Sequence, residues 1–305
     1  MLKKALLLPL LLFVLITSAH AKTGCGEKGV WLQVLGSGGP ELDDGRASTG
    51  YLIWNEGKAR LLIDMGSGSM FRFEQSGASV NDLDVVMFSH FHVDHSNDLP
   101  ALVKGSFFSD RDRDLLLYGP SGNRLMPSMT SFVKDLFWVG GAYQYLSSYL
   151  DGSDTYRLLP HDVVMTGRKQ QRVLSDSRYQ LTAVPVHHGA LPALAWKVAI
   201  NGKVIVFSGD MNNDNHTLAS LAKGADILVA HNAIPEGMSG VARNLHMPPS
   251  VIGEIAAQAQ VKLLVLSHRM KRTLGAEQTQ ATTEQIRKSY KGPMQFADDL
   301  QCFRP

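Results

Sequence analysis

One short segment of the sequence concentrates the residue types that bind metal ions. It holds three imidazoles and one carboxylate within six residues, His90, His92, Asp94 and His95. Burying so many polar groups without partners would be costly. Imidazole and carboxylate ligands without thiolate suit Zn²⁺, with Mn²⁺ or Fe²⁺ as alternatives. The segment therefore predicts a metal centre rather than a solvated loop.

The spacing of these residues allows two cations to be held. The apolar run 83–89 predicts a buried strand, and His90 and His92 follow at its end. Side chains two residues apart on a strand point the same way, so these two can share one ion. A turn then carries Asp94 and His95 toward a second ion.

Further residues of metal-binding type follow other predicted strands. The pair His187-His188 comes after the run 179–186, Asp210 after 204–208, and His268 after 263–266. A lone histidine at any of these places would be an ordinary buried residue. Because four strand ends all carry such side chains, we expect them to converge on one site.

The remaining pattern predicts an α/β fold in two comparable halves. Strands are also expected over 30–35, 51–54, 60–63, 195–200 and 227–230, and helices over 218–223 and 249–260. The interval 99–150 is interpreted as a helical insertion over the site. Alternating strands and helices favour a four-layer αββα sandwich, although the pattern alone does not separate it from an open doubly wound sheet.

The first residues have the features of a secretory signal peptide. Two lysines precede an apolar run over 5–16, and Ala19-His20-Ala21 is a cleavage motif, so residues 1–21 are the predicted signal and 22–305 the mature domain. A retained membrane anchor is the alternative. A periplasmic or secreted location is oxidising, so Cys25 and Cys302 are expected to form a disulfide rather than two free thiols.

Charge excludes few functions but gives no sign of a nucleic-acid partner. The 305 residues carry a formal net charge of +2, and the basic residues are spread along the chain. A nucleic-acid-binding protein commonly shows a massed basic stretch. We expect no nucleic-acid partner and no membrane contact after signal cleavage, and the sequence leaves a homodimer open.

The motifs together resemble those of the metallo-β-lactamase superfamily, in its RNase Z and arylsulfatase-like branch. The match extends over most of the mature chain and rests on the His90-x-His92-x-Asp94-His95 segment and on 35–40, 62–66, 207–210 and 264–268. The resemblance implies the metallo-β-lactamase fold and a dinuclear metal site. It places one ion on His90, His92 and His188, with His187 as the alternative, and the other on Asp94, His95 and His268, with Asp210 bridging.

The resemblance also assigns roles beside the metals. Asp64 would orient the histidine cluster, or alternatively only close a strand turn. Two close divalent cations activate a bound water, and Asp94 is the candidate general base or water-orienting group. His246 is the candidate general acid, but the glutamate that orients it in RNase Z-like proteins is replaced here by Asn232.

The expected reaction is hydrolysis of a small anionic ester, a phosphodiester or an aryl sulfate. Relatives that process tRNA carry a Gly-rich arm between the third histidine motif and the bridging aspartate, whereas only a short strand pair separates His188 from Asp210 here. Arylsulfatase-like and cyclic-nucleotide-phosphodiesterase-like relatives are the natural comparison. A β-lactam hydrolase and a non-catalytic, metal-containing binding module are the alternatives.

Overall fold

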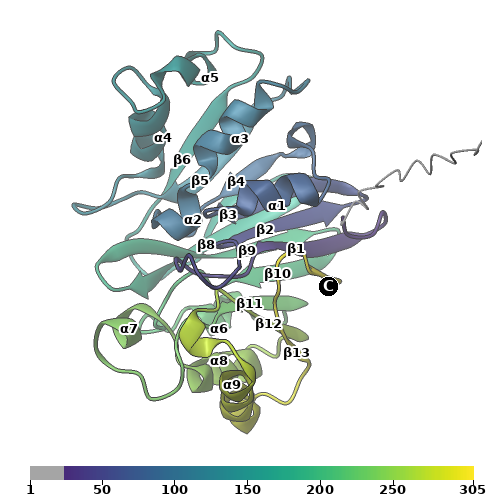
Figure 1. Cartoon of the computed structure of the whole chain (residues 1–305), viewed down its shortest axis with the longest axis vertical. Helices are drawn as coiled ribbons and strands as arrows, with labels where there is room; N and C mark the ends of the chain where they lie inside the picture. Colours follow the sequence, from purple (N-terminus) through teal and green to yellow (C-terminus); the bar gives the residue numbers. More distant parts are fainter. Residues whose placement is uncertain (1–23) are drawn as a thin grey trace, which may run out of the picture.

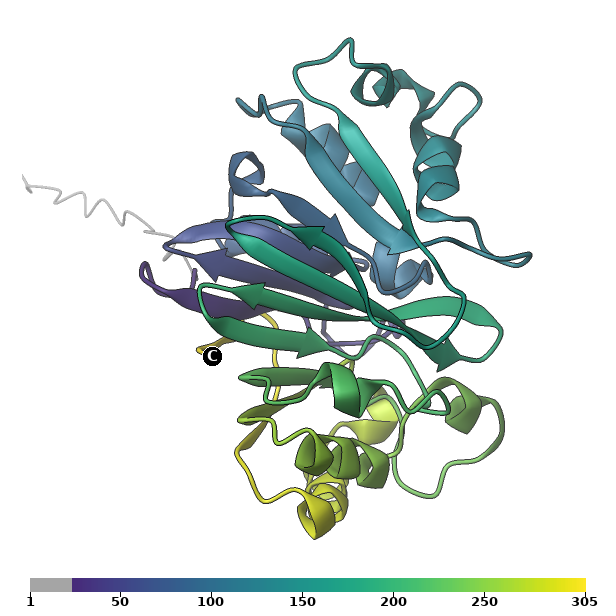
Figure 2. The same ribbon diagram turned by 180° about the vertical axis from the view of Figure 1, so that it is seen from behind.

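Two β-sheets packed face to face, with helices on both outer faces, make up the protein (Figures 1 and 2). The structure is a computed structural model, and it describes residues 24–305. These layers confirm the predicted αββα sandwich. The predicted signal peptide lies outside the described residues. Within residues 24–305, none of the helices has the length and apolar character needed to span a bilayer.

The first sheet forms because its strands alternate between two buried environments. In one strand Tyr51 and Ile53 face the second sheet, while Leu52 and Trp54 face the helices, as the two-residue period of a strand requires. The strand order is β14-β1-β2-β3-β4-β5-β6. Its strands are β1 Val30–Gly36, β2 Gly50–Asn55, β3 Lys58–Met65, β4 Val85–Met87, β5 Leu115–Pro120, β6 Leu158–Val163 and β14 Cys302–Phe303.

The second sheet repeats this arrangement. Ile227 and Val229 face the first sheet, and Leu228 and Ala230 face the helices. The strand order is β13-β12-β11-β10-β9-β8-β7. Its strands are β7 Gln171–Ser175, β8 Tyr179–His188, β9 Leu191–Ile200, β10 Lys203–Phe207, β11 Ile227–His231, β12 Leu263–Ser267 and β13 Met294–Phe296.

Helices cover the two outer faces and complete two further cores. On the first sheet lie α1 Ser69–Gln75, α2 Val93–Ser96, α3 Leu99–Ser106, α4 Met129–Phe137 and α5 Ser148–Asp151. On the second lie α6 Leu218–Leu221, α8 Pro249–Gln258 and α9 Ala276–Ser289, with α7 Gly240–Leu245 before α8. Short 3₁₀ helices are η1 Val80–Asp82, η2 Gln144–Leu146 and η3 Lys271–Thr273.

The interval 99–150 differs from the helical insertion expected from the sequence. It contains β5, which pairs in parallel with both β4 and β6 and is therefore part of the first sheet. The turn-forming residues Gly119 and Pro120 lie at the end of this strand. A Cβ at Gly119 would lie 2.8 Å from Met129 Sδ and 2.9 Å from Phe91 Cζ, so a larger residue there would displace these side chains. The helices α3 to α5 pack on this extended sheet.

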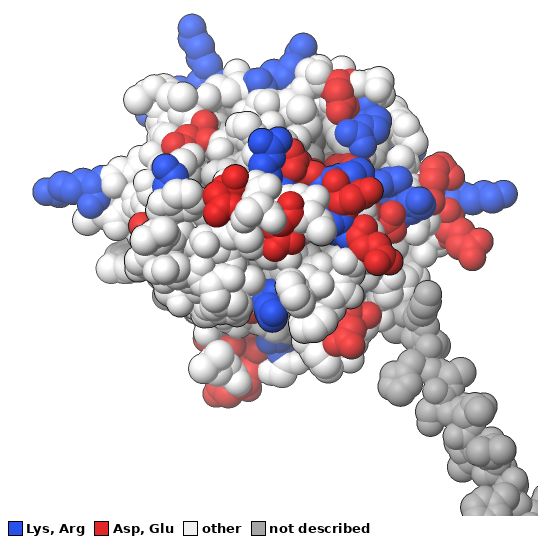
Figure 3. Space-filling view, turned by 90° about the horizontal axis from the view of Figure 1, so that it is seen from above, with Lys and Arg blue, Asp and Glu red and all other residues white. Residues whose placement is uncertain are grey.

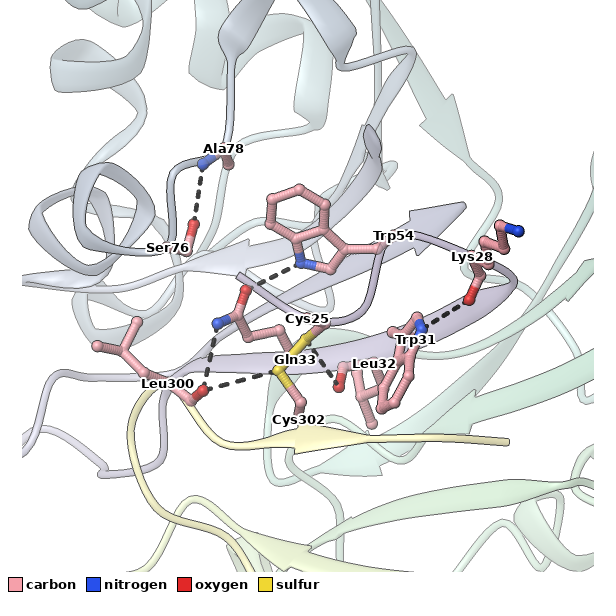
Figure 4. The surroundings of a disulfide bond; sticks show 10 residues. All are labelled: Cys25, Lys28, Trp31, Leu32, Gln33, Trp54, Ser76, Ala78, Leu300 and Cys302. Atoms are coloured by element: carbon pink, nitrogen blue, oxygen red, sulfur yellow. Dashed lines mark hydrogen bonds between the residues drawn. A yellow bond between two sulfur atoms is a disulfide. The ribbon is translucent and has the colours of Figure 1, made fainter. Parts of the chain in front are cut away.

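A disulfide joins the two ends of the described chain. Cys25 is bonded to Cys302 with a Cα–Cα distance of 5.7 Å (Figure 4). Cys302 belongs to β14, which pairs with β1 through Leu32 and Phe303. Beside the disulfide, Gln33 accepts a hydrogen bond from Trp54 Nε1 at 2.9 Å. The bond therefore fastens the last strand to the edge of the first sheet.

Candidate metal centre

The predicted metal-binding side chains lie together where the two sheets meet. They follow the carboxyl ends of β4, β8, β10 and β12. β10, β11 and β12 are parallel, and β8 has the same direction because both it and β10 are antiparallel to β9. Parallel strands end at one edge, and ligand sites of α/β proteins form there. The fold thus gathers residues that are far apart in sequence.

Two groups of side chains at this edge have the geometry to hold metal ions. In each group, ligand-type atoms lie within 4.8 Å of one another. The groups share one carboxylate, Asp210; the first also contains His90, His92 and His188, and the second His95, His231 and His268. A shared carboxylate between two histidine groups suits a dinuclear site.

Three of the histidines are held by one ring nitrogen and present the other to the centre. His90 Nδ1 lies 3.1 Å from Ser89 Oγ, and His188 Nδ1 lies 2.8 Å from the carbonyl oxygen of Leu245. His95 Nδ1 lies 2.9 Å from Asp64 Oδ2. Metal-binding histidines are oriented in this way, with the free nitrogen as the ligand.

Two histidine ring nitrogens at the centre are suited to bind divalent cations. Nε2 of His90 and Nε2 of His95 are buried and have no hydrogen-bond partner within residues 24–305. A buried polar atom without a partner costs free energy, and a coordinated cation would remove that cost.

Asp64 holds the histidine segment in place. Its Oδ1 accepts from the Ser89 amide at 2.7 Å, and its Oδ2 accepts from Ser89 Oγ at 2.7 Å and faces His95. Asp64 has a φ of 54° and is 1% exposed. A non-glycine residue in this region of φ is uncommon and commonly marks a functional site. Asp64 therefore does more than close a strand turn.

Asp210 lies between the two groups, and its two oxygens face different histidines. Oδ1 lies 3.4 Å from His268 Nε2, whereas Oδ2 lies 3.6 Å from His95 Nε2 and 3.8 Å from His188 Nε2. Gly209 before it has a φ of 59°, and a Cβ there would lie 2.8 Å from the Leu194 carbonyl oxygen. Only glycine fits this turn.

His231 is a member of the site that sequence reasoning missed. Its Nδ1 lies 2.7 Å from Asp210 Oδ1, and its Nε2 lies 3.0 Å from the Tyr51 hydroxyl. Both ring nitrogens are therefore engaged, and we assign His231 to holding Asp210 rather than to binding a metal. Its place at the end of β11 was the available sequence signal, since the neighbouring strands β10 and β12 are followed by the ligand-type residues Asp210 and His268.

Asp94 lies with the second group of histidines. Its Oδ2 is 3.2 Å from His268 Nε2 and 3.5 Å from His95 Nε2. The turn that carries Asp94 packs against Gly66, where a Cβ would come within 2.0 Å of the Asp94 carbonyl oxygen. This is the arrangement expected for the second ion.

The histidine pair at the end of β8 is divided between the site and the surface. His188 is 1% exposed, and its Nε2 lies 3.4 Å from His92 Nδ1. The neighbouring side chain, His187, is 35% exposed and lies 3.7 Å from Asp214. The structure therefore places His188 in the cluster and His187 outside it.

At the centre, the pKa of Asp210 is lowered so that its carboxyl group is ionised, and the pKa values of most of the histidines are also lowered so that their rings are neutral. Burial opposes the ionisation of Asp210, but the surrounding histidines, His268 first, hold its pKa well below the usual range. Burial lowers the pKa of His90 well below its usual value and also lowers that of His188. Both imidazoles are therefore neutral at pH 7, as metal ligands must be.

The centre opens into a cavity of about 400 Å³. Its floor carries metal-type side chains, and its wall is largely apolar. The lining residues are Pro40, His92, Asp94, His188, Asp210, Val241, Ala242, Leu245, His246, His268, Met270 and Arg272. None of these lining residues comes from the interval 99–150.

A loop before β2 covers one side of the centre and is held by the C-terminal segment. Asp299 accepts hydrogen bonds from the Ser37 amide and hydroxyl, from the Ala47 amide and from Arg72 Nε, at 2.8–3.0 Å. Within this loop, a Cβ on Gly39 would lie 3.0 Å from His268 Cε1. The last residues of the chain therefore fix the backbone that packs against a metal-type histidine.

His246 lies at the edge of the cavity without the expected partner. Its Nδ1 is buried, has no hydrogen-bond partner among the described residues, and lies 3.7 Å from Asp210 Oδ2. Burial lowers its pKa to about 3, despite the opposing effect of Asp210. The side chain of Asn232 is fully buried and is likewise unpartnered in residues 24–305. His246 is therefore neutral at pH 7. This weakens the prediction that His246 acts as a general acid.

Comparison with known proteins agrees with this fold. The human tRNase Z short form superposes with a TM-score of 0.68 at 19% identity, covering 90% of this chain and 98% of the other. The metallo-β-lactamase fold protein YhfI from Bacillus subtilis superposes with a TM-score of 0.67 at 18% identity, covering 90% and 98%. A ribonuclease Z of Methanosarcina mazei is 24% identical over 267 residues, which are 77% of this chain and 85% of that protein.

These likenesses place the chain in the metallo-β-lactamase superfamily, in its RNase Z branch. The predicted fold and superfamily are thus confirmed. Within that class, residues 30–291 match the family described as "Anti-Pycsar protein Apyc1", and the chain belongs to this family.

Proposed function

We propose that this protein uses two divalent cations, Zn²⁺ first, to hydrolyse a small anionic ester, with a phosphodiester favoured over an aryl sulfate. One observation carries the proposal: Asp210 faces both histidine groups at the floor of an open cavity. When bound, two such cations supply a water acidic enough to be a nucleophile at neutral pH. The hydrolase relatives of this fold act on phosphoester bonds, which favours the phosphodiester.

The protein's own residues would position the reactants. His90, His92 and His188 would hold one ion, Asp94, His95 and His268 the other, with Asp210 between them. Among residues 24–305, Asp94 Oδ2 has no donor other than the histidines, so it can orient the attacking water. A carboxylate can take the proton of that water if it lies within hydrogen-bond reach.

A small substrate fits the surroundings of the site better than a tRNA. Only β9 and β10 lie between His188 and Asp210, without a protruding arm in this described stretch. On the face drawn in Figure 3, Lys and Arg side chains lie among Asp and Glu and form no massed basic area. The disulfide in turn supports the proposal that the protein works outside the cytoplasm.

Metal analysis combined with a substrate panel tests the proposed function. We expect about two zinc ions per purified chain, since two clusters are present. The zinc-loaded protein should hydrolyse bis(p-nitrophenyl) phosphate, and loss of metal to a chelator should abolish turnover. p-Nitrophenyl sulfate and nitrocefin serve as the comparison substrates. Preferred turnover of nitrocefin would favour a β-lactam hydrolase, and metal content without any turnover would favour a binding module.

The role of His246 can be tested by comparing kcat of a His246 variant on substrates with different leaving groups. The general-acid role that the resemblance assigns to His246 predicts that His246→Ala lowers kcat about tenfold to a hundredfold on a 3′,5′-cyclic nucleotide, whose alkoxide leaving group needs a proton, whereas a histidine that is neutral at pH 7 predicts little change. The effect on bis(p-nitrophenyl) phosphate should be small, because p-nitrophenolate leaves without one. His187→Ala is the matched control, since His187 lies outside the cluster. An unchanged kcat on the cyclic nucleotide would refute a leaving-group role.

A further inference from the structure

Three basic residues follow the last metal-type histidine, and only one of them faces the cavity. Arg269 is buried and donates to the Thr273 carbonyl and to Thr279 Oγ1. Lys271 is paired with Asp43 at 2.6 Å. The third, Arg272, lines the metal cavity. It is the one Lys or Arg side chain among the cavity's lining residues in the described chain.

Arg272 forms no ion pair with another residue of the described chain. No carboxylate oxygen within residues 24–305 lies at ion-pair distance from its guanidinium. Its Nε donates to the Ala233 carbonyl oxygen at 2.7 Å, and its Nη2 lies 3.1 Å from Met270 Sδ. An arginine that is half-buried and not paired with a carboxylate retains its capacity for charge-assisted hydrogen bonds to an oxyanion.

The local backbone holds Arg272 in this position. It lies in η3, where the amide of Thr273 donates to the Met270 carbonyl at 2.7 Å. Thr273 Oγ1 lies 2.9 Å from the carbonyl oxygen of Asn232 and so ties this turn to the end of β11. A guanidinium fixed before the substrate arrives loses less conformational freedom on binding.

We propose that Arg272 is the anion-binding residue of the substrate pocket. Its guanidinium donates hydrogen bonds to a negatively charged oxygen of the ester. The apolar wall formed by Val241, Leu245 and Met270 contacts the uncharged part of the substrate. The inference rests on the proposed ester hydrolysis and deepens it. Arg272 binds and orients the substrate and takes no proton from it.

The test compares Arg272→Gln with Lys271→Gln. The control removes the same charge from the neighbouring residue, which is exposed and paired outside the cavity. Inorganic phosphate is titrated calorimetrically into the metal-loaded proteins. We expect Arg272→Gln to weaken phosphate binding by about tenfold or more, as loss of a hydrogen bond to a charged group predicts. Lys271→Gln should bind as the wild type does, and both should retain the wild-type metal content.

Steady-state kinetics separate substrate binding from a merely structural role. For Arg272→Gln, KM for bis(p-nitrophenyl) phosphate should rise by about tenfold with a smaller change in kcat, while KM for the uncharged p-nitrophenyl acetate should stay near the wild-type value. Arg272→Lys, which keeps the charge, should recover part of the phosphate affinity. Equal losses in Arg272→Lys and Arg272→Gln, or an equal effect on the acetate ester, would overturn the proposal.

The phosphate titration keeps this inference distinct from the proposed reaction. If the wild-type protein hydrolyses no ester, the proposed function fails, and the titration still reports whether Arg272 binds an anion. If it hydrolyses the diester but Arg272→Gln binds phosphate as tightly as the wild type, only the role of Arg272 is refuted.

Discussion

Asp210→Asn should lose at least one of the two metal ions and nearly all hydrolytic activity. The amide keeps the shape of the side chain but removes the negative charge shared by the two groups of histidines. The surrounding histidines hold the Asp210 carboxyl in its ionised form, so the substitution changes the charge at neutral pH. Because a dinuclear site supplies several kcal/mol of transition-state stabilisation, we expect kcat/KM to fall by about a thousandfold or more.

Metal content and kcat/KM measured on the same preparation check this expectation. Asp214→Asn is the matched control, because it removes a carboxylate four positions along the chain that is 59% exposed and faces His187 rather than the centre. The control should keep both ions and wild-type kinetics. Two tightly bound ions and near-normal turnover in Asp210→Asn would show that this carboxylate does not bridge the metals.

Cys302→Ser should lower the free energy of unfolding by about 2–5 kcal/mol, the usual cost of losing a native disulfide. The bond spans a sequence separation of 277 residues, so opening it releases almost the whole chain in the unfolded state. For a domain of this size, that loss corresponds to a Tm lower by about 5–15 °C.

Thermal unfolding with and without a reductant tests this expectation. Dithiothreitol should lower the Tm of the wild type to that of the variant and leave the Cys25→Ser/Cys302→Ser protein unchanged. If the oxidised wild type shows two reactive thiols and an unchanged Tm under reduction, the disulfide is absent from the protein in solution.

The metal-type residues could be predicted because each follows a recognisable strand. The runs before His188, Asp210 and His268 are apolar and short, as buried strands are, and all three side chains lie at the centre. The preference for His188 over His187 came from the resemblance to the family motif, and the structure places His188 in the cluster. Local sequence thus contained most of the candidate site.

What the sequence could not show depends on contacts between distant residues. The turn-forming Gly119 and Pro120 obscured β5, although this strand is buried between β4 and β6. The role of His231 depends on which oxygen of Asp210 it reaches. The sequence did not show that α7 and η3 contribute to the wall of the cavity. Turn propensity and spacing do not encode such distances, because tertiary packing decides them.

The hydrogen bonds from the loop beside His268 to Asp299 affect the order in which the metal centre assembles during folding. Every side chain of the two metal-type groups precedes residue 299 in the chain, and Asp299 adds contacts from the C-terminal segment to a loop that Arg269 and Lys271 also hold. A nascent polypeptide that stops short of this residue would possess all the ligands but would lack these contacts. We therefore expect tight capture of the cations to be a late event, following the docking of the final strand rather than guiding the earlier ones.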